Sequence, residues 1–255
     1  MPIDLAYRDD VAIVTINRPE ALNALSFALI RDIGARLEEV AQSRARAMLF
    51  VGAGPKAFCA GADIKELLGR DLQAHRRDTE RGQATFARIA ALPMPSIAVI
   101  HGFAFGGGLE LALACSFRLG TKAAKVGLPE IKLGLVPGYG GTQRLPRVVG
   151  EARALEMILT GRTVEAEEAH RIGLLNRIVE GDPVEAGIAF AREFTGYGMI
   201  ALAHCRAAVE RALDVPVHEG LKIEADLSTV VFQSADSVEG MTAFAEKRRA
   251  QFRDA

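Results

Sequence analysis

The stretch IAVIHGFAFGGGLELALAC, residues 97–115, decides the fold of this chain. An apolar, β-branched segment leads into three consecutive glycines, and a second apolar run follows them. This order predicts a buried strand, a tight turn and a buried helix. The first N–H groups of such a helix have no partner within the helix and lie at the positive end of its dipole.

The segment FCAGADIKELL, residues 58–68, predicts a second turn of this kind. Its glycine lies among small residues, so the backbone can turn sharply, and we expect Asp63 to cap the helix that begins there. If both helix starts face one point, their free amides form an oxyanion hole, with two donors for one carbonyl oxygen. The alternative is that both are only tight strand-to-helix turns, which α/β proteins need in any case.

Two carboxylates are candidates for catalysis. Glu110 comes directly after the glycine run, and Glu130 follows Pro129. A pair of carboxylates in an apolar pocket can share general acid and base work. Each residue taken singly is also explained as a first-turn acid that the helix dipole favours. Glu110 differs because its neighbours on both sides are apolar, which predicts burial, and a buried acid needs a reason.

The rest of the chain repeats the pattern and then changes. Apolar segments at 11–17 and 47–54 predict buried strands, so strand, glycine turn and helix recur over about the first 180 residues. Helices are expected at 152–161, 183–215, 217–234 and 236–252. The sequence thus predicts an α/β core domain at 1–195 and a helical region at 196–255, with the boundary near Thr195–Gly196.

The composition of the 255 residues excludes several classes of protein. Apolar residues make up 49% and the formal net charge is -1, which is typical of globular proteins rather than disordered chains or nucleic-acid coats. The three cysteines, Cys59, Cys115 and Cys205, form no CxxC pair, which favours reduced thiols in the cytosol. The charged start MPIDLAYRDD is unlike a signal peptide, and no apolar run reaches the ~20 residues of a membrane helix. We therefore expect a cytoplasmic protein that binds neither nucleic acid nor membrane.

Several common catalytic motifs are absent from the sequence. No GxxxxGK[ST], GxGxxG, GxSxG or HExxH pattern occurs. The sequence therefore contains none of the motifs that usually indicate ATP chemistry, hydride transfer, serine hydrolysis or zinc hydrolysis. Backbone amides and carboxylates are the chemistry that remains.

Five segments of the chain, in order, resemble the enoyl-CoA hydratase/isomerase (crotonase) family. They are INRPEALNALS (16–26), FCAGADIKELL (58–68), IAVIHGFAFGGGLELALACSFRLGT (97–121), GLPEIKLGLVPGYGGTQRLPRVVG (127–150) and EGMTAFAEKRRAQF (239–252). The blocks span nearly the whole chain, and five in order are far more specific than any one of them. The resemblance implies an α/β spiral of ββα units and a C-terminal helical region that builds homotrimers, often paired into hexamers.

The resemblance also implies an activity, the addition of water across the 2,3 double bond of a trans-2-enoyl-CoA to give a 3-hydroxyacyl-CoA. The family's oxyanion hole corresponds to the N–H groups of Ala62 and Gly107, which would hold the thioester carbonyl. Its two hydratase glutamates correspond to Glu110, as base on the water that attacks Cβ, and Glu130, as the acid that protonates Cα. This division stays open, because a coupled pair titrates as a unit. The amide of Gly138 would contact the water.

The resemblance implies no metal and no separate cofactor, since coenzyme A is part of the substrate. Positions that bind the CoA part in the family correspond to Ala21, Leu22, Ala60, Asp63 and Ile64, with Lys65 as a further candidate for phosphate contact. Phe244 and Lys247 correspond to residues that approach the nucleotide end, often from a neighbouring subunit. Lys65 and the basic run at 246–249 would supply local positive charge for the anionic CoA.

Three alternatives remain at this point. Many isomerases of the family keep only the second glutamate, so a Δ3,Δ2-enoyl-CoA isomerase is the first. The segment 66–86, where family members vary in acyl specificity, is polar and rich in arginine, which leaves room for an acidic enoyl-CoA of aromatic catabolism. A non-catalytic protein that binds RNA or another partner is the third. Tyr139, where the family often has a smaller residue, and Phe103 and Phe105 beside the glycine turn are expected to shape the acyl pocket.

Overall fold

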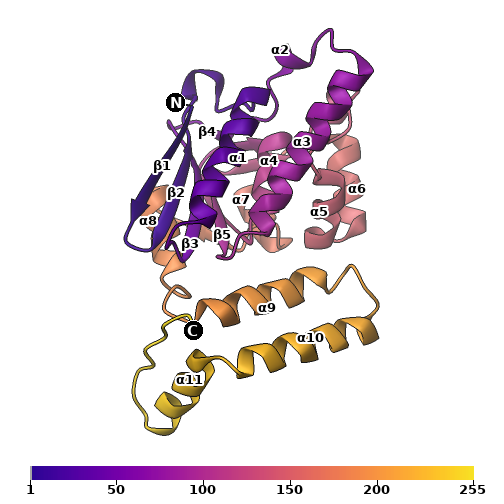
Figure 1. Ribbon diagram of the computed structural model, residues 1–255. Coiled ribbons are helices and arrows are strands. Elements are labelled where there is room, and N and C mark those ends of the chain that lie inside the picture. The colour runs from indigo at the N-terminus through magenta and orange to yellow at the C-terminus, as the bar shows by residue number, and fades with distance from the viewer. Residues whose placement is uncertain (1) are drawn as a thin grey trace.

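Residues 2–255 are described by a computed structural model, and most of its parallel strands form one large sheet (Figure 1). This sheet has the order β1-β2-β3-β5-β7-β10, and only β1 and β2 pair antiparallel. The strands are β1 (Ile3–Arg8), β2 (Val11–Ile16), β3 (Ala47–Gly52), β5 (Ser96–Ile100), β7 (Phe117–Thr121) and β10 (Arg177–Val179).

A smaller second sheet, with the order β4-β6-β8-β9, completes the repeat. Its strands are β4 (Ala57–Cys59), β6 (Phe103–Phe105), β8 (Lys125–Gly127) and β9 (Val164–Glu165). The successive pairs β3/β4, β5/β6 and β7/β8 each place one strand in each sheet and are followed by helices. The predicted α/β spiral of ββα units is therefore confirmed.

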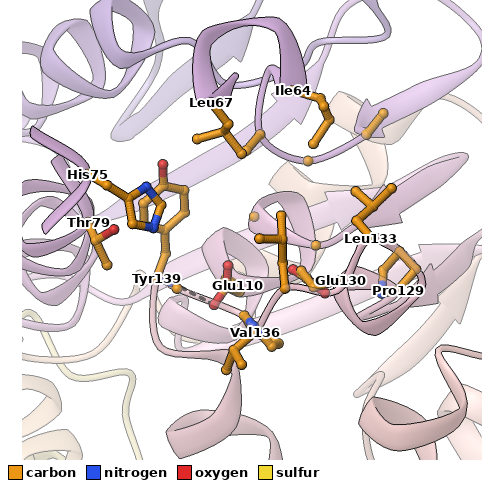
Figure 2. Close-up of a pocket in the computed structure, with 18 of the residues that line it drawn as sticks. Ile64, Leu67, His75, Thr79, Glu110, Pro129, Glu130, Leu133, Val136 and Tyr139 are labelled. Atoms are coloured by element: carbon orange, nitrogen blue, oxygen red, sulfur yellow. Dashed lines mark hydrogen bonds between the residues drawn. The ribbon is translucent and has the colours of Figure 1, made fainter. Parts of the chain in front are cut away.

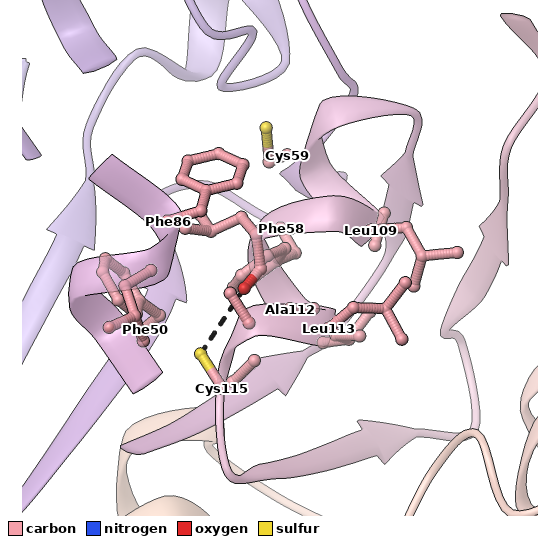
Figure 3. Close-up of a cluster of buried hydrophobic side chains, with 14 of the residues drawn as sticks. Phe50, Phe58, Cys59, Phe86, Leu109, Ala112, Leu113 and Cys115 are labelled. Atoms are coloured by element: carbon pink, nitrogen blue, oxygen red, sulfur yellow. Dashed lines mark hydrogen bonds between the residues drawn. The ribbon is translucent and has the colours of Figure 1, made fainter. Parts of the chain in front are cut away.

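Helices cover both faces of the large sheet. One face packs against α1 (Phe27–Ala41), α3 (Leu72–Ala90) and α4 (Gly107–Ala114), and the other against α8 (Pro183–Ala191). Every residue of α4 is buried, and Figure 3 shows phenylalanines of β3, β4 and α3 around it. The remaining elements of this part are η1 (Pro19–Ala21), α2 (Ile64–Leu67), η2 (Glu130–Leu133), α5 (Gly141–Val149), α6 (Glu151–Thr160) and α7 (Ala166–Arg171).

The last three helices extend away from the sheets, at the lower end of Figure 1. They are α9 (Met199–Arg211), α10 (Val217–Phe232) and α11 (Ala235–Ala245). Arg206 of α9 donates to the carbonyls of Ala90, Leu92 and Met94, and so ties α9 to the C-terminal end of α3. Apolar side chains on these helices and on the loop between α9 and α10 are exposed: Val209, Leu213, Val217, Leu221, Val230, Phe232, Val238, Met241 and Phe244.

The structure corrects the helix predictions in two places. The helix expected at 183–215 is two helices, because the chain breaks at 192–198, where Arg46 donates to the carbonyls of Thr195 and Tyr197. The helix expected at 236–252 ends at Ala245, because Lys247 has a left-handed backbone with φ 55°. The division at Thr195–Gly196 falls within the break and stays a prediction; Met1 lies outside the described residues.

Candidate active site

The structure has a cavity of about 490 Å³ where the start of α4, the loop after β4, helix α3 and the segment 129–139 meet (Figure 2). Seven of the predicted site residues line it: Ala60, Ala62, Ile64, Gly107, Glu110, Glu130 and Gly138. They come from three segments that are far apart in the sequence. The spiral brings these segments together because strands β4, β6 and β8 are neighbours in the small sheet.

Two backbone amides at this cavity have no hydrogen-bond partner. A parallel bridge between Leu25 and Ala62 uses the carbonyl of Gly61, at 2.7 Å, and the N–H of Asp63, at 2.8 Å, which leaves the Ala62 N–H free. Gly107 is the first residue of α4, so its N–H has no acceptor within the helix. Neither amide donates to an acceptor anywhere in residues 2–255. Both are available to a ligand oxygen.

Gly108 holds the two loops together. A Cβ atom at this position would lie 2.0 Å from the carbonyl oxygen of Cys59, at the end of β4. The start of α4 therefore rests directly on the backbone that leads to Ala62. Only glycine allows this approach, which brings the segments of both amides to one cavity.

Glu110 is the most deeply buried acid of the site, with 1% of its surface exposed. Its Oε1 accepts hydrogen bonds from the amides of Tyr139, at 2.8 Å, and Gly141, at 2.7 Å. Burial raises the pKa of Glu110 from 4.5 to about 7; the nearby Glu130 also raises it, while the two amides lower it. A carboxyl group with this pKa changes its protonation state near neutral pH, as a general base requires.

Glu130 faces the same cavity from the first turn of η2. Its Oε2 is buried and finds no hydrogen-bond partner in the described part of the chain. Burial raises the pKa of this carboxyl above its usual range. A buried polar atom without a partner is costly, so this oxygen has a free hydrogen-bonding position for a ligand or a water. Glu110 and Glu130 thus border one space, as an acid and base pair must.

The loop that carries the two donors to Glu110 is itself held from both sides. The peptide between Gly138 and Tyr139 donates its N–H to Glu110, and its carbonyl accepts from the side chain of Gln83 at 2.9 Å. The carbonyl of Tyr139 accepts from Arg144 at 2.9 Å. No pattern in the sequence pointed to Gln83, Arg144 or the amides of Tyr139 and Gly141.

The remaining predicted residues lie outside the cavity lining. Leu22 is adjacent to the site, because its carbonyl accepts from the amide of Ala60 at 3.0 Å, and Ala21 precedes it. Asp63 caps α2, as predicted, and its side chain also pairs with Arg18 at 2.8 Å. Lys65 is an exposed residue of α2.

Phe244 and Lys247 do not reach the cavity of their own chain. Phe244 is 87% exposed on α11, and Figure 1 places α11 at the opposite end of the molecule from α2. In the basic run that follows, Arg248 pairs with Glu239 and Glu246. Within one subunit, this run is therefore not placed to meet a ligand at the cavity.

Helix α3 contributes a row of side chains that the sequence analysis missed. His75, Thr79 and Gln83 recur every four residues and line one side of the cavity. This spacing was the available signal, because it puts the three side chains on one face of a helix. The arginines of the segment 66–86 do not line the cavity, and Arg70 and Arg81 pair with Asp78 instead.

Within residues 2–255, no group of three or more His, Cys, Asp or Glu side chains is placed to hold a metal ion. Of the helices described, none combines the length and the apolar character that crossing a membrane requires.

Comparison with known proteins gives a consistent result. Residues 7–255 match the family model described as enoyl-CoA hydratase/isomerase. A probable enoyl-CoA hydratase of Rhizobium meliloti is 42% identical, over 95% of this chain and 94% of the relative. A crotonyl-CoA hydratase of Syntrophomonas wolfei is 38% identical, over 98% of this chain and 97% of the relative. The crystal structure of an enoyl-CoA hydratase from Bacillus anthracis covers 100% of both chains, with a TM-score of 0.94 and 38% identity.

Proposed function

The chain belongs to the enoyl-CoA hydratase/isomerase family, and from this premise we propose that it is a hydratase that converts a trans-2-enoyl-CoA into a 3-hydroxyacyl-CoA. The observation that carries this proposal is that Glu110 and Glu130 border the same cavity as the free amides of Ala62 and Gly107. An isomerase needs to move a proton only, whereas a hydratase must also activate a water. Two carboxyl groups at one space suit the second task.

In the proposed mechanism, the thioester carbonyl oxygen accepts from the amides of Ala62 and Gly107. These donors withdraw electron density, so Cβ becomes electrophilic and the enolate-like charge is stabilised as it forms. Glu110 takes a proton from a water molecule while the oxygen of that water bonds to Cβ. Glu130 gives a proton to Cα, so the overall result is the addition of one water. We also propose that the amide of Gly138 contacts this water, and in support Gly138 lines the cavity.

The test is an assay of purified protein with enoyl-CoA substrates. The reaction is monitored through the loss of the ultraviolet absorbance of the conjugated thioester. Hydration of crotonyl-CoA is the expected result. A flat trace with every enoyl-CoA would contradict the proposal and favour a binding protein. Glu110→Ala should abolish hydration; if isomerisation of a 3-enoyl-CoA is the main wild-type reaction and survives this change, the isomerase alternative is correct.

The acidic enoyl-CoA alternative has little support from the cavity. A dicarboxylyl substrate needs a cation for its second carboxylate. His75 is the only basic side chain of the described residues that lines the cavity. We therefore expect crotonyl-CoA to be hydrated much faster than any acidic enoyl-CoA.

We further propose that the enzyme works as a homotrimer or as a pair of trimers in the cytoplasm, without a metal or separate cofactor. The exposed apolar side chains of α9–α11 are a suitable surface for such contacts. Phe244 and Lys247 would then approach the CoA of a neighbouring subunit, as the family resemblance implies, since neither lines the cavity of its own chain. Lys65, Asp63, Ala21 and Leu22 remain predicted CoA contacts.

The pH dependence of the reaction should follow the raised pKa of Glu110. Only the ionised carboxylate can accept a proton, and its pKa is about 7 rather than 4.5. Activity should therefore fall about 10-fold per pH unit below about pH 7, and it should fall again at higher pH, where Glu130 has lost the proton that it must give to Cα. Measurement of kcat/KM for crotonyl-CoA between pH 5.5 and 9 checks this. A profile that stays flat down to pH 5.5 would show that Glu110 is not the base, or that its pKa is not raised.

Replacement of Gln83 should weaken catalysis without weakening binding. In Gln83→Leu, the Gly138 carbonyl loses its donor, so the peptide that orients Glu110 becomes more mobile. Loss of one such hydrogen bond corresponds to a fall in kcat of about 3- to 10-fold, with KM unchanged. Gln73→Leu, on the same helix but outside the cavity, is the control. Equal effects of the two changes would show that α3 is only generally disturbed.

A further inference from the structure

The ring of Tyr139 is a fixed wall of the cavity. The residue is 6% exposed, and its ring meets Phe86 of α3 edge to face, with the centroids 5.5 Å apart. The ring lines the same cavity as Glu110, His75 and Thr79, and Figure 2 labels all four residues. It lies between α3 and the start of α4, because it approaches both Gly82 and Gly107 closely.

Two glycines confine this ring. A Cβ atom at Gly82 would lie 2.4 Å from Cδ1 and Cε1 of Tyr139, and one at Gly107 would lie 3.3 Å from Cδ2 on the opposite edge. Gly82 is in the interior of the 19-residue helix α3, where glycine is less favourable than alanine. The space that this glycine leaves is filled by the tyrosine ring. The ring is thus packed against Phe86, against the backbone of α3 and against the start of α4.

We propose that Tyr139 limits the length of the acyl group and makes this enzyme selective for short-chain enoyl-CoA. The inference rests on the proposed hydratase function. The ring borders Gly107, which would hold the thioester carbonyl, and its own amide lies 2.8 Å from Glu110 Oε1, beside which Cβ would react. An acyl chain that continues past Cβ therefore meets the ring within a few carbons. Each methylene that a rigid pocket cannot accommodate lowers kcat/KM roughly 10-fold or more.

The test compares wild type with Tyr139→Ala and Tyr139→Phe on trans-2-enoyl-CoA substrates of four, six, eight and ten carbons. Wild type should prefer four carbons and lose at least about 10-fold in kcat/KM by ten carbons. Tyr139→Ala should raise the ten-to-four ratio by about 10-fold or more, and Tyr139→Phe should keep the wild-type profile, because the ring and not the hydroxyl forms the wall.

A double-mutant comparison tests the contact with α3. Gly82→Ala should push the ring toward the substrate and reduce activity on six carbons, and this loss should disappear when Tyr139 is also alanine. If a variant is inactive, calorimetry of butanoyl-CoA and decanoyl-CoA binding makes the same comparison of chain lengths without catalysis.

If wild type hydrates no enoyl-CoA, the proposed function is wrong and this inference is wrong with it. If wild type hydrates them but treats all lengths alike, or Tyr139→Ala leaves the length profile unchanged, only the inference about Tyr139 is overturned.

Discussion

Glu110→Gln is expected to reduce kcat for hydration by roughly 10²- to 10⁴-fold while the fold stays intact. The glutamine carbonyl can still accept from the amides of Tyr139 and Gly141, which now meet Glu110 Oε1 at 2.8 and 2.7 Å. The side chain therefore keeps its position and loses only its ability to take a proton. Steady-state kinetics with crotonyl-CoA measure the loss.

The same substitution should raise stability above neutral pH. Because the pKa of Glu110 is raised to about 7 in the folded state, the native protein keeps a proton that the unfolded chain has released between about pH 4.5 and 7. Stability therefore falls as pH rises across this window, and a neutral glutamine removes that fall. Denaturant unfolding of both proteins at pH 5 and pH 8 checks the sign.

Glu151→Gln is the matched control, since Glu151 is exposed at the first turn of α6. This variant should keep full activity, because Glu151 does not line the cavity. If Glu110→Gln retains hydratase activity within about 10-fold of wild type, Glu110 is not the general base and the proposed division of labour is wrong.

Gly108→Ala should be the most damaging change that replaces none of the proposed catalytic side chains. The new methyl group would lie 2.0 Å from the carbonyl oxygen of Cys59, a backbone atom that cannot move aside cheaply. Helix α4 must then shift away from β4, and the Gly107 amide shifts with it relative to that of Ala62. The loss of one oxyanion donor typically costs about 10²- to 10³-fold in rate, and we expect a fall in kcat/KM of this size. Overpacking should also lower stability by about 1–3 kcal/mol.

Gly34→Ala provides the control for this prediction. A Cβ atom at Gly34, in the middle of α1, would meet its nearest neighbour at 3.5 Å, an ordinary contact. This variant should keep its activity and gain slightly in thermal stability, because alanine favours a helix. A Gly108→Ala protein with wild-type kcat/KM would show that the approach of α4 to β4 does not position the oxyanion amides.

The sequence predicts those properties of the site that depend on residues close together in the chain. The apolar neighbours of Glu110 predicted its burial, and the small residues around Gly61 predicted the turn that Asp63 caps. The glycine run placed the free amide of Gly107 at a helix start. The three-residue strands β4 and β6 were too short to show a period, so the repeating pattern alone did not reveal them.

The helix break at 192–198 shows the opposite case. The local pattern predicts one helix. However, Arg46, which lies about 150 residues earlier in the chain, donates hydrogen bonds to the carbonyls of Thr195 and Tyr197 and so stabilises the non-helical segment between α8 and α9. The two donors to Glu110 were missed for the same reason, because Tyr139 and Gly141 are 29 and 31 residues away from it.

The sequence by itself determined the recurring order of long strand, glycine turn and helix, the family and the residue types available for chemistry, since these follow from local pattern and from matching blocks. Only the tertiary structure decided which groups meet. The raised pKa of Glu110 arises because distant segments remove water from it and bring Glu130 close. The wall at Tyr139 exists because a glycine of α3 leaves room for a ring from a loop more than 50 residues later. Desolvation and packing depend on contacts in space, and the folded chain alone supplies them.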